Sequence, residues 1–277
     1  MAMAHRGGAL NNRSRIKWQL IRPAKQHGIG EFIIMPIAYL GEVALLFADT
    51  VRAAISERLR LRQLVEQMDE VGVRSLLIVL LTVSSAGIVL SLYTAKELAT
   101  RGAGHFVGWL LAYTIVRELG PMVTAIVVAA RIGAAFAAEL GTMKVTEQID
   151  ALRSLAVDPI AYLVVPRMLA CIIMMPALTM LADIAGTLSG MIIASAVGVH
   201  PNIFLDSIRS FLTVTDLLIG LIKSVPFGIL IAIVSCHQGL ETTGGAMGVG
   251  RATTDAVVLS LIFVYVADVV MSSVLPK

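Results

Sequence analysis

Ionisable side chains inside long apolar stretches are the first candidates for chemistry in this sequence. They are Arg117, Glu118, Asp183, Lys223 and Asp268. A charged side chain near the centre of a lipid bilayer costs about 2.5–3.5 kcal/mol, so each of them is expected to face the protein interior and to find a partner. The depths of Lys223 and Asp268 in their stretches are compatible with an ion pair, which Glu118 could join.

Two interpretations of these buried charges stay open. In the first, a polar cluster lines or gates a pathway through the membrane. In the second, the ion pairs only determine how the helices pack, and such pairs add little net stability. The sequence does not favour either interpretation over the other.

A short amphipathic segment at residues 142–156 is the second candidate. Its apolar stripe, at spacings of four, three and four residues, is Val145, Ile149, Leu152 and Ala156. Its other faces carry Lys144, Glu147, Gln148, Asp150 and Arg153. The segment is too short and too charged to cross a bilayer, and Asp158-Pro159 ends it. It therefore predicts a helix that lies along the membrane surface, either to dock a soluble partner or as an ordinary connection.

Small residues recur every fourth position in the second apolar stretch. They are Ala125, Ala129, Gly133, Ala137 and Gly141. Gly186 and Gly190 form a GxxxG pair further along. This spacing lets two helix backbones approach closely. We therefore predict close helix packing, against a helix of the same chain or of a second copy.

Several kinds of chemistry are not expected in this chain. Residues 245–252 have the glycine spacing of a P-loop, but Arg251 and Ala252 replace the lysine and the hydroxyl residue that bind phosphate and Mg²⁺. No His/Cys group has metal-ligand spacing, and no nucleophile–base pair stands out. Cys171 and Cys236 lie in apolar blocks and are expected to be packing residues. We predict a non-enzyme with no catalytic residue, metal or cofactor of its own.

The composition indicates the elements that position these residues. The chain has 277 residues, of which 57% are hydrophobic and 15% are charged. Soluble domains contain roughly 45–50% apolar residues and about 25% charged residues. The excess of apolar residues, gathered in long blocks, predicts an all-α membrane protein. Of the 22 Lys and Arg residues, 11 precede residue 75. This placement predicts a cytoplasmic N-terminus rather than a nucleic-acid partner.

The apolar blocks predict five transmembrane helices. These are residues 75–95, 106–138, 160–197, 212–236 and 253–275. Before them come a basic segment at residues 1–30 and interfacial and cytoplasmic helices at residues 31–74, so residues 75–277 form the membrane domain. Residues 31–51 could instead be a true span. The second block exceeds the roughly 20 residues of one crossing, and Gly120-Pro121 predicts a kink or break. Five crossings place the C-terminus outside.

Residues 117–152, RELGPMVTAIVVAARIGAAFAAELGTMKVTEQIDAL, resemble the signature of the MlaE/YrbE family of ABC transporter permeases. IKSV at residues 222–225 and GRATT at residues 250–254 are similar to further motifs of that family. The resemblance implies a homodimeric permease of the bacterial inner membrane or the plastid envelope. Its implied partners are a cytoplasmic ATPase, which binds the ATP and Mg²⁺, and an MCE-domain protein. Its implied substrates are lipids, commonly phospholipids.

The resemblance also implies roles for the candidate residues. Residues 142–156 would be the coupling helix that seats in the ATPase, and Arg117, Glu118, Lys223 and Asp268 would lie near the lipid path. Asp183 matches no family motif. Two alternatives remain beside this reading: an ion-coupled secondary transporter that uses the buried charges, and a structural membrane scaffold.

Overall fold

The computed structural model describes residues 31–56 and 60–275, and within these ranges every regular element is helical. The predicted all-α class is therefore confirmed. The chain forms two compact units, and the boundary between them lies between Ala48 and Asp49. The described part of the first unit is the beginning of helix α2 (Glu31–Ser56). The predicted basic segment, residues 1–30, lies outside the described residues.

Five helices of the second unit are long and apolar enough to cross a membrane, which confirms the predicted number. They are Leu61–Thr100, Gly104–Val145, Ile160–Ala196, Val214–Leu240 and Gly245–Val274. Helix α2 is not among them in the described part of the chain. It continues five residues beyond the predicted end at residue 51, to Ser56, because nothing in residues 52–56 interrupts a helix.

The first span begins earlier than predicted. The amphipathic helix α3 (Leu61–Met68) continues through a π-helical turn, η1 (Asp69–Val73), into α4 (Arg74–Thr100). Residues 61–74, the later part of the segment that was predicted as cytoplasmic helix, are thus continuous with the first span.

The second span is one helix with two wide turns. It comprises η2 (Gly104–Phe106), α5 (Val107–Thr114), η3 (Ile115–Leu119), α6 (Gly120–Val128), η4 (Ala129–Gly133) and α7 (Ala134–Val145). At Gly120-Pro121, where a kink or break was predicted within one overlong crossing, the helix is not broken, and a π-helical turn directly precedes the proline. Pro121 has no N–H to donate, and the Gly120 N–H donates to the Ile115 carbonyl, five residues back. The helix therefore stays continuous through the proline.

The third span runs through η5 (Ile160–Val164) and α9 (Val165–Ala196), a single crossing as predicted. Helix α10 (Pro201–Phe211) connects it to α11 (Val214–Leu240), and α12 (Gly245–Val274) is the last span. Residues 237–252, between the predicted fourth and fifth spans, are mostly helical, because α11 extends to Leu240 and α12 begins directly after Gly244, whose φ is 88°.

Helix α4 packs closely on α9. A Cβ atom at Gly87 would lie 2.3 Å from the Gly186 carbonyl oxygen, so only glycine permits this approach. The Ser91 hydroxyl donates to the Gly190 carbonyl at 2.7 Å. The predicted GxxxG pair therefore contacts a helix of the same chain.

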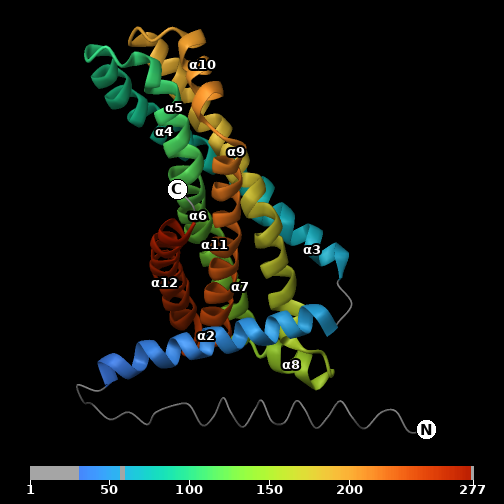
Figure 1. The fold of residues 1–277 in the computed structure, drawn as a ribbon. Coiled ribbons are helices and arrows are strands. Elements are labelled where there is room, and N and C mark those ends of the chain that lie inside the picture. The colour runs from blue at the N-terminus through green and yellow to red at the C-terminus, as the bar shows by residue number, and fades with distance from the viewer. Residues whose placement is uncertain (1–30, 57–59, 276–277) are drawn as a thin grey trace. The chain divides into compact units, whose positions relative to one another are not determined.

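The other predicted stripe of small residues packs on α11, which also lies along α9 and α12 (Figure 1). Ala129, Gly133, Ala137 and Gly141 are all buried. A Cβ atom at Gly133 would lie 2.8 Å from Ser235 Oγ, and one at Gly141 would lie 2.9 Å from Thr242 Oγ1. The stripe thus serves packing within one chain.

Candidate functional site

Lys223 lies at the centre of a polar cluster between three spans. Its Nζ donates to Glu118 Oε2 at 2.7 Å, to Asp268 Oδ1 at 3.3 Å and to Ser272 Oγ at 2.7 Å. The Lys223 side chain is 1% exposed. The structure thus brings together three of the residues that the sequence singled out, and it adds Ser272, which sequence reasoning missed because serine is common in spans.

The approach of two helices positions this cluster. Gly220 lies three residues before Lys223 on α11, and a Cβ atom there would lie 2.0 Å from the Val116 carbonyl oxygen. Glu118 follows two residues later, within the wide turn η3. Glycine on α11 therefore brings Lys223 within reach of Glu118.

The cluster is buried unevenly. One ammonium group faces two carboxylates, and the Glu118 side chain is 38% exposed whereas that of Asp268 is 15% exposed. The positive charge is thus enclosed by protein, while one negative charge reaches the surface of the single chain. This arrangement can present a polar group at membrane depth.

Arg117 belongs to a different ion pair. Its Nη1 donates to Asp216 Oδ1 at 3.0 Å, and both side chains are largely buried. Asp216 also accepts from the Thr213 hydroxyl at 2.7 Å, in the capping box that starts α11. Sequence reasoning missed Asp216, although its place one turn after a threonine is a helix-start signal. The four candidates of the predicted lipid path therefore form two separate groups.

Two further arginines bind at wide helical turns and were missed. Arg131, in η4, donates to Ser75 Oγ at 2.8 Å and to the Glu70 carbonyl at 3.1 Å. Arg167 donates to Glu139 Oε2 at 2.6 Å and to the Leu163 carbonyl at 2.6 Å. Both lie in predicted spans, so the rule that identified Lys223 would also have found them.

Asp183 joins neither ion-pair group. It is 3% exposed, and both of its carboxylate oxygens are without a hydrogen-bond partner in the described residues. A Cβ atom at Gly120 would lie 1.7 Å from Asp183 Oδ1. The carboxyl group therefore packs against the backbone of the second span.

The predicted surface helix at residues 142–156 is two pieces, which corrects the sequence-based boundaries. Residues 142–145 complete α7, and Gln148–Ser154 forms the short helix α8. Glu147 stands between them at φ 60°, so the helical periodicity does not continue across it. Ile149 is buried, Leu152 is half-buried, and Val145 and Ala156 are exposed.

Several charges of this segment pair with one another. Asp150 lies 2.9 Å from Arg153 Nη1 and 3.9 Å from Lys144 Nζ. Glu147 and Gln148 are exposed. The segment therefore presents a charged surface that is anchored by one buried isoleucine.

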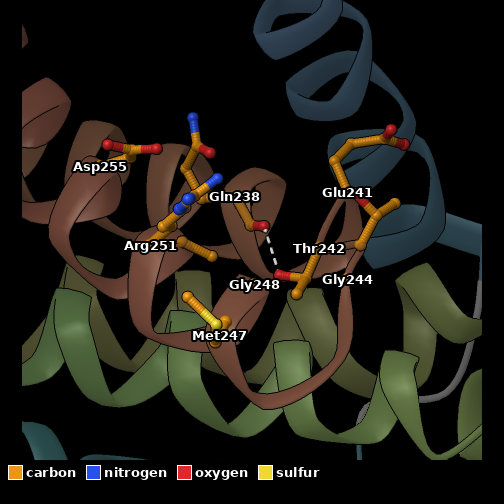
Figure 2. Close-up of a pocket in the computed structure, with 10 residues that line it drawn as sticks. Gln238, Glu241, Thr242, Gly244, Met247, Gly248, Arg251 and Asp255 are labelled. Atoms are coloured by element: carbon orange, nitrogen blue, oxygen red, sulfur yellow. Dashed lines mark hydrogen bonds between the residues drawn. The ribbon is translucent and has the colours of Figure 1, made fainter.

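A pocket of about 400 Å³ lies between the end of α11 and the first turns of α12 (Figure 2). Its lining includes Thr242, Gly248, Arg251 and Asp255. A Cβ atom at Gly248 would lie 1.8 Å from the Thr243 carbonyl oxygen, so close packing accounts for this glycine of the P-loop-like run. In the part of the chain that the structure describes, no three His, Cys, Asp or Glu residues are grouped to hold a metal ion.

Comparison with known proteins covers most of the chain. The family described as Permease MlaE matches residues 64–274. A probable ABC transporter permease of Synechocystis sp. is 46% identical over 78% of this chain and 82% of its own length. The chloroplast protein TRIGALACTOSYLDIACYLGLYCEROL 1 of Arabidopsis thaliana is 40% identical over 83% of this chain and 66% of its own length. A probable ABC transporter permease of Rickettsia typhi is 36% identical over 90% of this chain and 96% of its own length.

Proposed function

The chain belongs to the MlaE family of ABC transporter permeases, and from this premise we propose that it moves lipids, phospholipids in particular, between the inner membrane and an MCE-domain partner. As a permease subunit it is not itself an enzyme, and its class implies a separate ATPase. The Arabidopsis relative is named after a glycolipid, trigalactosyldiacylglycerol, and this name supports a lipid substrate.

The exposure of Glu118 is the observation that carries this proposal. Its side chain is 38% exposed and lies in the second span. A carboxylate that faced lipid tails would be costly, so this surface is expected to face a polar cavity or another protein. A second copy of the chain meets this requirement if the two clusters face a shared cavity that receives lipid headgroups. We therefore propose a homodimer whose lipid path lies beside Arg117, Glu118, Lys223 and Asp268.

The α8 segment, residues 144–153, is the proposed contact with the ATPase; it comprises the end of α7, the two connecting residues and most of α8. Because only two residues separate α8 from α7, we propose that a movement of α8 is transmitted to the second span and hence to Glu118. In the proposed cycle, ATP binding closes the paired ATPases, and the coupled spans open or collapse the lipid cavity. We place the protein in a bacterial inner membrane or the plastid envelope, with the N-terminus cytoplasmic and the C-terminus periplasmic.

Reconstitution tests this function. The permease, copurified with its ATPase, is placed in phospholipid vesicles, and the movement of a fluorescent phospholipid is followed. We expect movement that requires ATP hydrolysis and that Glu118→Gln slows while the ATPase stays bound. Movement that follows a proton or sodium gradient without ATP would instead identify an ion-coupled secondary transporter. No movement in any condition would indicate a scaffold.

A further inference from the structure

Asp183 poses a problem of charge at membrane depth. Its side chain is buried inside the third span, and neither carboxylate oxygen has a hydrogen-bond partner in residues 31–56 and 60–275. Burying an ionised carboxylate without a partner is very costly, so native structures pair such a group or neutralise it. A positive charge must therefore come to Asp183 from some source.

The cationic side chains at similar depth already have acidic partners. Arg117 binds Asp216, and Lys223 binds Glu118 and Asp268. Further along the same helices, Arg131 binds Glu70 and Arg167 binds Glu139. The described part of the chain thus provides no cationic group that contacts Asp183.

Two buried hydroxyl groups share this lack of partners. Thr124 and Thr179 are 0% exposed, and their Oγ1 atoms have no hydrogen-bond partner in the described residues. Other span threonines behave differently: Thr82, Thr94 and Thr114 each donate to the carbonyl four residues earlier, at 2.7 Å. Thr124 and Thr179 do not make this bond, so their hydroxyls are free for another ligand.

The packing of the second and third spans places these groups at neighbouring levels. A Cβ atom at Gly190 would meet Leu111, one at Gly186 would meet Ile115, and one at Gly120 would meet Asp183. The two helices are therefore antiparallel in a constant register. Thr124 lies four residues after Gly120, and Thr179 lies four residues before Asp183. In antiparallel helices these two threonines are therefore at the same level, one turn beyond the contact of Gly120 with Asp183.

We propose that Asp183, Thr124 and Thr179 bind one monovalent metal cation of the size of Na⁺ between the second and third spans. Carboxylate and hydroxyl oxygens are ligands that suit such a hard cation, and a single carboxylate balances a single positive charge. Because Gly120 and Pro121 follow the wide turn η3, the bound cation would hold the second span next to that turn.

Thermal unfolding of the purified full-length chain tests this site. The melting temperature is compared in NaCl and in choline chloride of equal ionic strength and pH. We expect Na⁺ near a hundredfold of its dissociation constant to raise the melting temperature by about 5 °C. Asp183→Asn should abolish this shift. The matched control is Asp255→Asn, which removes an exposed carboxylate on α12 and should keep the full shift.

Equal melting temperatures in the two salts would overturn the proposal and would leave a proton as the neutralising charge. A Na⁺-dependent shift that persists in Asp183→Asn would overturn it as well. Should that variant fail to fold, Thr179→Val removes one oxygen ligand, and an unchanged half-saturating Na⁺ concentration would count against the site. None of these measurements depends on lipid movement, so the cation site and the transport function can fail separately.

Discussion

Lys223 and Asp183 are both buried ionisable residues, but they differ in their hydrogen-bond partners. Lys223 is enclosed by three oxygen-bearing side chains from two other spans. Asp183, at comparable burial, has no hydrogen-bond partner in the described residues. A satisfied cluster determines one arrangement of its helices, whereas an unsatisfied group indicates a missing ligand. For single residues, the hydrogen-bond partners of a buried ionisable side chain, rather than its charge alone, therefore indicate its role.

Replacing Lys223 should destabilise the fold strongly. In Lys223→Met, Glu118 and Asp268 would lose the shared cation, and removing one partner of a buried ion pair costs about 3–5 kcal/mol. The measurement is the free energy of unfolding of the purified permease. Arg209→Met is the control, because Arg209 is 79% exposed and its pair with Asp206 contributes little. Equal stability of the two variants would contradict a structural role for the cluster.

The helices of this protein combine long continuous spans with local wide turns. The second span is one continuous helix through the π-helical turns η3 and η4, and the third span begins with the π-helical turn η5. π-helical turns are often found at functional positions. Here η3 carries Arg117 and Glu118, and η4 carries Arg131. At the scale of elements, the two wide turns of the second span each carry side chains that form ion pairs with other helices.

Reversing charges on the α8 segment should detach the ATPase. In Glu147→Lys combined with Asp150→Lys, exposed negative groups become positive, and the pairs of Asp150 with Lys144 and Arg153 are lost. We expect normal yield and melting temperature of the permease but little copurified ATPase. Asp206→Lys reverses an exposed carboxylate on α10, at the other end of the third span, and should retain the ATPase. Retention by the double variant would refute the contact.

The second unit of the molecule presents distinct surfaces at the two ends of its five spans. Gly141, just before the α8 segment, packs against Thr242 beside the start of α12, so the α8 segment and the α11–α12 pocket lie at one end. Helix α10, between the third and fourth spans, lies at the other. If the N-terminus is cytoplasmic, as proposed, the end that carries α8 is cytoplasmic as well. At the scale of the whole molecule, the proposed orientation would place the α8 segment where an ATPase can reach it.

Cysteine labelling in intact cells tests this orientation. Leu155→Cys, at the end of α8, is expected to react only with a membrane-permeant reagent, whereas Val274→Cys, at the end of α12, should react with an impermeant one. Both positions are exposed, at 74% and 76%. The native Cys171 and Cys236 are buried and should contribute little background. The reverse pattern would overturn the proposed orientation.

The sequence alone was sufficient for the class of protein and for several contacts. Long apolar blocks can satisfy their backbone in lipid only as helices or closed barrels, so five helical spans were predictable. The cost of charge at membrane depth singled out Lys223 and Asp268 before their contact was known. Small residues at every fourth position marked the packing face of the second span. These properties depend on composition and periodicity, which are local.

The tertiary structure decided which groups meet. Arg117 pairs with Asp216 rather than with the Lys223 cluster, and the surface segment divides at Glu147, whose left-handed conformation no periodicity predicts. Asp183 comes level with Gly120, and Thr179 with Thr124 one turn further on, because glycines determine the register of the second and third spans. Such pairings join residues far apart in the chain. They depend on how closely helices approach, and that distance follows from packing rather than from any local pattern.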